Sequence, residues 1–264
     1  MKSKFAIIPL VLAAAGLSQA GTTTPAVAPA TGNTAVSEPN GKLDSSFANL
    51  DGEDAWLNQG SFSIPLAQSL GFQLDALQTH TSDSDFAGIG GHLFWRDYQV
   101  GLLGITAGGV WGDDADSYEI GLEAERYFDW FTIGARAGFA DIDYDPGFFP
   151  TNQDDNGIYA IAYLTAYPIE DLAITLSVGQ RFDNTLVSLG AEYDLPIENL
   201  TAIAEVAWGE DDYEHAMIGL RYYFGSGKSL KMRHRQDDPQ NILSDIQQPM
   251  LMQDAPLRKG RGDE

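Results

Sequence analysis

A two-residue alternation of apolar and polar side chains recurs along most of this chain and restricts its fold more than any other feature. In residues 118–139, YEIGLEAERYFDWFTIGARAGF, apolar side chains occupy nearly every second position, and Glu, Gly, Thr and Arg lie between them. Side chains two positions apart in a β-strand point to the same face, so this segment forms a strand with one apolar and one polar face. The pattern predicts strands and leaves open which face is inside.

Twelve such segments follow one another, and none has helical periodicity. They cover residues 42–50, 55–64, 70–79, 86–95, 100–111, 117–127, 131–141, 157–167, 172–182, 185–193, 200–209 and 214–224. Their lengths are close to the roughly 9–11 residues that a tilted transmembrane strand needs. Regular short strands with turns between them predict an all-β, up-and-down antiparallel barrel. The many glycines inside the strands are expected where a barrel bends or its lumen is narrow.

The connections between the segments alternate between two classes. One class, which includes residues 50–55 and 141–157, is rich in Asp and Glu and contains no Lys or Arg. The other class, which includes residues 65–69 and 167–172, is short and often contains proline. Alternate connections of an up-and-down sheet lie at opposite ends, so one end is acidic and the other has tight turns. Outer-membrane barrels show this asymmetry of longer outer loops and short periplasmic turns.

The start of the chain favours export. Residues 1–20 combine a basic start, an apolar run and small residues before the end, so they are predicted to be a signal peptide. Residues 21–41 are rich in Thr, Pro, Ala and Gly and are predicted to be a flexible leader. The domain prediction is therefore a barrel over residues 42–224, followed by residues 225–264.

Aromatic side chains and lysine usage favour a membrane over water outside the barrel. No lysine occurs between Lys42 and Lys228, whereas soluble sheets commonly use lysine on exposed strands and edges. The aromatic residues fall near the two ends of the strands, where two membrane interfaces attract amphipathic rings. The two predicted belts are Trp56, Trp111 and Trp208 at the acidic end, and Trp95, Tyr127, Phe128, Trp130, Tyr163 and Tyr167 at the other.

Three stretches, residues 60–76, 88–104 and 218–239, resemble the porin-like β-barrels of proteobacterial outer membranes. The resemblance implies the outer membrane of a Gram-negative bacterium, with contacts to outer-membrane lipid and lipopolysaccharide, and a homo-oligomer as one candidate assembly. Such barrels commonly end at an aromatic residue, whereas forty residues follow Phe224 here. The net charge of -23 excludes nucleic acid as a partner, because binding it requires a basic surface.

Strand parity predicts which charged side chains face the lumen. The candidates are Asp75, His92, Arg96, Glu119, Glu123, Glu125, Arg136, Arg181, Glu192, Glu205 and Arg221. Arg136 is expected to pair with Glu123 or Glu125 on the preceding strand. The set is compatible with a filled, ion-paired interior and with a pore lining that sorts solutes by charge.

Metal binding and catalysis receive weak support. Asp141, Asp143 and Asp145 alternate like the opening of a calcium loop, but Pro146 stands where such a loop needs glycine. A solvated acidic loop is the simpler interpretation, and Ca²⁺ or Mg²⁺ linking these loops to lipopolysaccharide phosphates is the other. No local motif supports catalysis around the histidines, and no other cofactor is expected, so the chain is predicted not to be an enzyme.

The segment after Phe224 is basic and then polar, and it is predicted to be a disordered periplasmic tail. Its basic cluster, Lys228 to Arg235, is either solvated or in contact with anionic lipid or the cell wall. The predicted function is passive diffusion of small hydrophilic solutes, with a preference for cations from the acidic mouth. The alternative is a non-conducting structural or adhesive barrel that binds a partner through its acidic loops or its tail.

Overall fold

The computed structural model describes residues 34–82, 84–113, 115–144, 155–182, 184–210, 212–225, 227–237 and 239–259. The predicted signal peptide and most of the predicted leader lie outside the described residues. The strands are β1 (Asn40–Leu50), β2 (Glu53–Ala67), β3 (Leu70–Thr81), β4 (Asp85–Asp97), β5 (Gly101–Gly112), β6 (Ala115–Tyr127), β7 (Phe131–Tyr144), β8 (Asp155–Ile169), β9 (Leu172–Arg181), β10 (Asn184–Asp194), β11 (Leu200–Gly209) and β12 (Glu214–Phe224).

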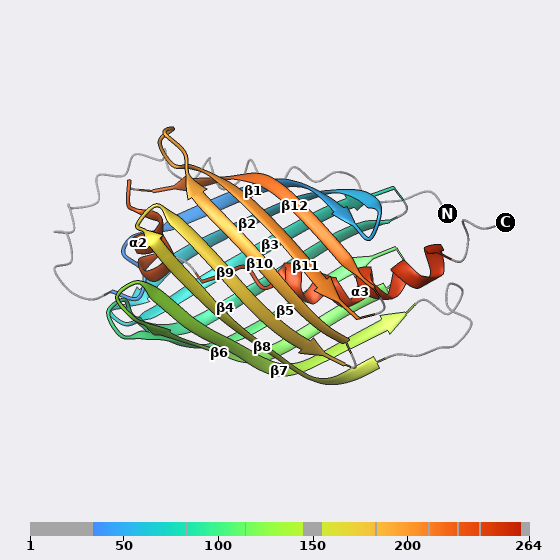
Figure 1. Ribbon diagram of the computed structural model, residues 1–264. Helices are drawn as coiled ribbons and strands as arrows, with labels where there is room; N and C mark the ends of the chain where they lie inside the picture. Colours follow the sequence, from blue (N-terminus) through green and yellow to red (C-terminus); the bar gives the residue numbers. More distant parts are fainter. Residues whose placement is uncertain are drawn as a thin grey trace, which may run out of the picture. The chain divides into compact units, whose positions relative to one another are not determined.

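These strands form a closed antiparallel barrel, which confirms the predicted twelve-stranded up-and-down fold (Figure 1). Each strand pairs with its neighbours in the chain, and β1 pairs with β12 from Gly41 opposite Phe224 to Leu50 opposite His215. Several strands are longer than predicted, for example β2, which extends to Ala67 with an irregularity after Pro65. The extra length arises because backbone pairing continues beyond the alternating side chains that mark a strand in the sequence.

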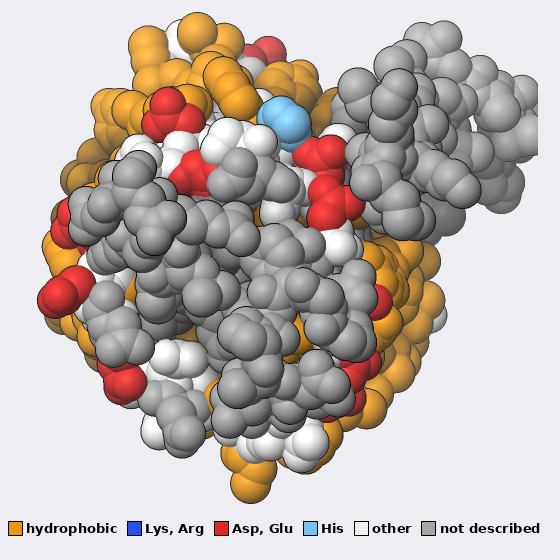
Figure 2. All heavy atoms as spheres, turned by 90° about the vertical axis from the view of Figure 1, so that its right-hand side faces the viewer, with side chains coloured by type: hydrophobic (Ala, Val, Ile, Leu, Met, Phe, Trp, Pro, Cys, Tyr) orange, Lys and Arg blue, Asp and Glu red, His pale blue; other side chains and the backbone are white. Residues whose placement is uncertain are grey.

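The apolar face of the strands points outward. In β6, Ile120 and Leu122 are 64% and 62% exposed, whereas Glu119 and Glu123 are 7% and 6% exposed. Figure 2 shows hydrophobic side chains over the outside of the barrel. This polarity is the reverse of a soluble protein, in which large apolar side chains form the core.

The aromatic belts are only partly as predicted. Trp56 and Trp208 near the acidic loops, and Trp95 and Trp130 near the short turns, are about half exposed on the outer face. The prediction was wrong for three tyrosines, because their strand parity places them inside. These are Tyr127, Tyr163 and Tyr167, all buried.

The prediction of a disordered tail was wrong for residues 227–251. Helix α2 (Leu230–Gln236) lies at the short-turn end, and α3 (Leu243–Lys259) lies within the barrel (Figure 1). Leu230, Leu243 and Ile246 are fully buried. The tail is ordered because its apolar side chains meet apolar side chains inside the barrel. Among the described residues, no helix is long and apolar enough to cross a bilayer.

The predicted flexible leader also differs at its end. Strand β1 begins at Asn40, and the residues just before it pack against the short-turn end of the barrel. Ala35 and Val36 are fully buried with Phe94, Leu102 and Tyr127. The Ser37 amide donates to the carbonyl of Gln236, so this segment and α2 close the same end together.

Candidate functional site in the barrel lumen

The lumen gathers the charged residues that strand parity singles out. The structure places all eleven candidates on inward-facing positions: Asp75, His92, Arg96, Glu119, Glu123, Glu125, Arg136, Arg181, Glu192, Glu205 and Arg221. Most of them form ion pairs or hydrogen bonds with residues of other strands or of the C-terminal segment. Two arrangements, each with one basic side chain between two carboxylates, organise the interior.

The first arrangement lies on the inner face of β2–β6, which we call the helix wall. His92 Nε2 lies 2.9 Å from Asp75 Oδ2, and its Nδ1 lies 3.0 Å from Glu123 Oε1. Ionised carboxylates only accept hydrogen bonds, so both ring nitrogens donate when the imidazole carries both protons. Glu123 reaches His92 across β5 at Gly104, where a Cβ would lie 2.6 Å from Glu123 Oε1.

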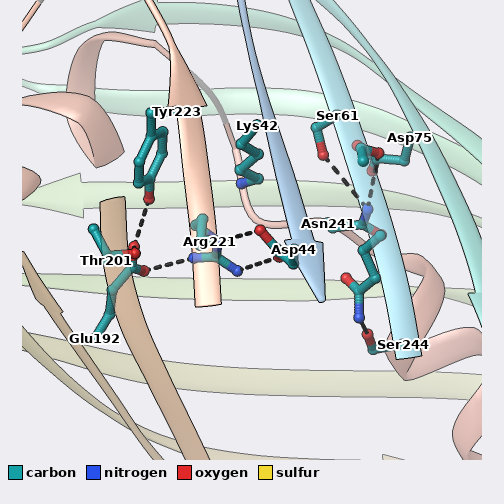
Figure 3. A network of polar contacts seen from close by, with 12 residues as sticks. Lys42, Asp44, Ser61, Asp75, Glu192, Thr201, Arg221, Tyr223, Asn241 and Ser244 are labelled. Carbon is teal, nitrogen blue, oxygen red and sulfur yellow. Dashed lines mark hydrogen bonds and ion pairs between the residues drawn. The ribbon is translucent and has the colours of Figure 1, made fainter. Parts of the chain in front are cut away.

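The second arrangement lies on the inner face of β8–β12 and β1, which we call the cavity wall. Arg221 holds Asp44 with two hydrogen bonds of 2.6 and 2.7 Å and Glu192 with one of 2.5 Å. Glu192 also accepts hydrogen bonds from Thr201 and Tyr223. Figure 3 shows Arg221 between the two carboxylates. A bidentate guanidinium–carboxylate pair is among the strongest polar contacts in proteins.

The remaining arginines differ from expectation in one respect. Arg181 pairs with Glu119, whereas Arg136 pairs with Asp245 of α3. The predicted pairing of Arg136 with Glu123 or Glu125 was therefore wrong. Glu125 instead accepts hydrogen bonds from two of the inward tyrosines, and Glu123 faces His92. The reason is that the C-terminal segment brings its own carboxylate into the lumen.

The C-terminal segment follows the helix wall from the short-turn end toward the acidic loops. Pro239 O accepts hydrogen bonds from Lys42 and Gln73, which lie near the short-turn ends of β1 and β3. Further along β3, Thr79 donates to Gln247 with a distance of 2.9 Å. Figure 3 shows Asn241 of this segment beside Ser61 and Asp75. The segment therefore crosses much of the barrel length inside the lumen.

A cavity of about 280 Å³ remains beside α3, lined mostly by the cavity wall and also by residues of β2, β6 and β7. Its lining extends from Tyr167 and Ala173 near the short turns to Asn184 and Tyr213 near the acidic loops. Charged side chains of both signs line it, including Lys42, Asp44, Arg136, Arg181, Glu192, Glu205, Arg221 and Asp245. Compared with a hydrocarbon core of about 30 Å, this volume is small, so the free space left in the lumen is narrow.

The lining of this cavity reaches the acidic end of the barrel at Asn184 and Tyr213. Asp and Glu side chains lie around the rim of this end in Figure 2. Those near the ends of the strands include Asp51, Glu53, Asp54, Asp85, Asp116, Glu210, Asp212 and Glu214. Burial raises the pKa of the Tyr213 phenol, and the nearby Asp51 and Glu205 carboxylates raise it further, so this hydroxyl stays neutral.

The short-turn end is covered by α2, and the arginines of its basic cluster contact the barrel itself, which neither of the two sequence-based interpretations, a solvated cluster or contact with lipid or cell wall, had included. Arg233 lies 4.5 Å from the ring centroid of Tyr223 and donates to Asn199 Oδ1. Arg235 lies over the rings of Tyr127 and Tyr167 and donates to backbone carbonyls of the β6–β7 turn. These arginines attach α2 to the barrel.

The proposed metal ligands are only partly described. Asp141 and Asp143 belong to β7, where they share the outward-facing side of the strand, rather than to a loop. Asp145 lies outside the described residues. Within the described part of the chain, no group of three or more His, Asp and Glu side chains is placed to hold a metal ion. Divalent cations at the acidic loops stay a prediction.

A closed barrel with an apolar outer face and a charged interior is a transmembrane β-barrel, because closure pairs every strand and leaves no edge exposed to lipid. No family model and no curated protein matches this sequence. Among solved structures, the chain is similar to "KdgM porin in complex with disordered oligogalacturonate" and to the NanC porin.

The TM-scores are 0.54 and 0.52, each at 12% identity. The matches cover 70% and 68% of this chain, and 99% and 98% of the two porins. The chain therefore has the fold of the porin-like outer-membrane β-barrels, and the resemblance seen in the sequence is confirmed at the level of the fold.

Sequence reasoning missed the lumenal role of the C-terminal segment. Two signals for it are present in the sequence. Ile242, Ile246 and Met250 repeat at the four-residue spacing of a helix face. In addition, inward positions near the acidic end, such as Leu57 and Val110, are apolar although the lumen is otherwise polar. Together they indicate an apolar helix against an apolar inner wall.

Proposed function

We propose that this protein is an outer-membrane, porin-like channel for passive diffusion of small hydrophilic solutes, along the passage between α3 and the cavity wall. The observation that supports this most is the cavity with charged side chains of both signs, whose lining residues range from the short-turn end to the acidic end. Its Arg221, Glu192 and Asp44 side chains are held by one another and line the passage as fixed charges. Fixed charges in a narrow pore favour or oppose ions of each sign.

We also propose that cations are preferred over anions. Charges of both signs line the passage itself, so the difference comes from the mouth, where carboxylates concentrate on the rim. A mouth of one sign raises the local concentration of the opposite ion. The lumenal charges then control passage without chemistry, and the channel performs no catalysis.

Planar-bilayer recordings test both parts. Folded full-length protein is expected to produce discrete conductance steps of small size, because the passage is narrow. In a KCl gradient, the reversal potential is expected to lie on the cation-selective side. The absence of steps above leak from correctly folded protein contradicts the channel, and an anion-selective reversal potential contradicts the preference alone.

A non-conducting barrel is the second candidate, and the occupied lumen favours it. The α2 helix covers the short-turn end and α3 fills much of the interior. Such a barrel presents its acidic loops, or the end of its C-terminal segment, to a partner. The same recordings separate the candidates, since this barrel yields no steps.

A further inference from the structure

The inner face of β2–β6 forms a groove that holds residues 239–251, which we call the plug. We propose that this groove is a binding site for the plug and that its occupancy sets the width of the passage. The proposal rests on the channel function proposed above. Three independent features support it: the glycines of the groove, its apolar side chains, and the contacts of Asp245 with two arginines outside the groove.

Two inward-facing glycines of the groove lie where the plug comes closest to the strands. The three atoms nearest to a Cβ built on Gly90 all belong to Ile242 and Leu243, at 3.1–3.3 Å. The nearest atom to a Cβ on Gly108 is Ile246 Cδ1, at 2.9 Å. Glycine weakens a strand, so its presence at these inward positions requires a reason. The reason is close approach of the plug.

Apolar side chains at the acidic half of the lumen complete the groove. Leu57, Leu77 and Val110 point inward and are buried in one cluster with Leu243 and Ile246 of the plug. Without the plug, these side chains face a polar, water-accessible lumen. Removing such apolar surface from water is favourable, at about 25 cal/mol per Å². Covering these side chains with the plug is therefore more favourable than exposing them to water.

Asp245 fastens the plug from the side of the cavity. Its carboxylate pairs with Arg136, and its backbone carbonyl accepts a hydrogen bond from Arg181. Pro249 lies four residues later in α3 and has no N–H, so the helix itself has no donor for that carbonyl. The proline thus exposes an acceptor at the position where Arg181 donates.

The size of the barrel agrees with this role. A barrel of about eight strands has an interior that its own side chains fill. Twelve strands enclose more space, and an α-helix with side chains has a diameter of about 10 Å. In this barrel, α3 takes up the extra space beside the helix wall and leaves the narrow cavity on the other side. If the plug leaves, the space that it occupies joins the cavity, and the passage becomes wider.

The test compares single-channel conductance of full-length variants that displace the plug with one that does not. Gly90→Leu inserts a side chain where Ile242 and Leu243 lie, and Asp245→Arg places a third cation beside Arg136 and Arg181. Both are expected to raise the conductance several-fold. Gly190→Leu is the matched control on the cavity wall, where the atoms nearest to a Cβ lie at 3.7–4.0 Å. It is expected to lower the conductance, because it narrows the cavity.

Asp245→Arg changes no strand residue, so it keeps the test valid if Gly90→Leu fails to fold. Because the chain has no native cysteine, the pair Gln59→Cys and Ser244→Cys provides a second readout. These side chains are hydrogen bonded across the groove. A short thiol crosslinker is expected to join these two cysteines in folded protein. The control pair, Ser188→Cys on the cavity wall and Ser244→Cys, is expected to crosslink poorly.

The outcomes separate the two proposals. If the unmodified protein conducts and Gly90→Leu and Asp245→Arg show the same conductance as the unmodified protein, the plug proposal fails and the channel proposal stands. If no variant conducts, both fail. If Gly190→Leu raises the conductance as much as Gly90→Leu, barrel distortion explains the effect and the plug proposal is overturned. Efficient crosslinking to Ser188→Cys instead of Gln59→Cys also overturns it.

Discussion

The two walls of the lumen contain the same charge arrangement in different surroundings. On the helix wall, His92 lies between Asp75 and Glu123, and their side chains are 0%, 0% and 7% exposed. On the cavity wall, Arg221 lies between Asp44 and Glu192, and their side chains are 19%, 5% and 8% exposed. The first group is covered by the plug, and the second borders the cavity. The carboxylates are buried in both groups, and the difference is that the central arginine of the cavity wall stays partly exposed, whereas the central histidine of the helix wall is fully covered.

The largest expected effect concerns the side of the membrane on which the chain emerges after α3. Because α3 runs along it to the acidic end, an epitope tag after Glu264 is expected on the same membrane side as a tag inserted at Gly52. A tag between Tyr98 and Gln99, in a short turn, is expected on the opposite side. Antibody labelling of intact and permeabilised cells measures this. If the C-terminal tag is labelled under the same conditions as the tag between Tyr98 and Gln99, the C-terminal segment does not cross the lumen.

Removing the cation of the helix wall is expected to destabilise the barrel strongly. His92→Ala leaves two buried carboxylates facing each other, and breaking a buried ion pair costs about 3–5 kcal/mol. Urea unfolding in micelles, followed by tryptophan fluorescence, measures the free energy of unfolding. The ion selectivity is expected to stay unchanged, since His92 does not line the cavity. A loss under about 1 kcal/mol contradicts a dry helix wall.

The corresponding change on the cavity wall is expected to be milder in stability and visible in transport. Arg221→Ala removes hydrogen bonds to two carboxylates, but water in the cavity replaces part of them, so the loss is about 2 kcal/mol. It also removes a positive charge from the passage, so the reversal potential is expected to become more cation-selective. Arg221→Lys keeps the charge and serves as the control. If the reversal potential is unchanged, ions do not pass along the cavity beside Arg221.

The smallest effect compares two threonines, one on each wall. Thr79→Val removes a buried hydrogen bond to Gln247 of α3 and is expected to cost about 1 kcal/mol, because its acceptor stays buried. Thr175→Val removes the Thr165–Thr175 hydrogen bond beside the cavity and is expected to cost under about 0.5 kcal/mol, because water substitutes for it. Equal losses in urea unfolding remove the distinction between the walls.

Much of the barrel could be predicted because strand alternation is a local property. In β6, the alternation of Glu119 and Glu123 with Ile120 and Leu122 identified the polar and the apolar face. The acidic connections and the positions of the aromatic residues then indicated that the apolar face points outward. The tyrosine error shows the limit of reasoning by strand end, since Tyr127 lies at the end of a strand but points inward. Parity was the more reliable criterion.

The partners of the lumenal charges could not be predicted in the same way. Arg136 lies directly opposite Glu123 in the pairing of β6 with β7, yet its ion pair is with Asp245. Glu123 instead reaches His92 over Gly104, two strands away. Such contacts depend on side-chain reach across a closed lumen and on a segment more than a hundred residues away, and neither is encoded in local periodicity.

The sequence by itself determined the strand number, the inward set of charged residues and the two different ends, because each depends on neighbours along the chain. Only the tertiary structure decided that the C-terminal segment folds inside the lumen. Helix α2 has only seven residues and α3 is interrupted by Pro249, so both gain stability from the contacts that a closed barrel brings around them.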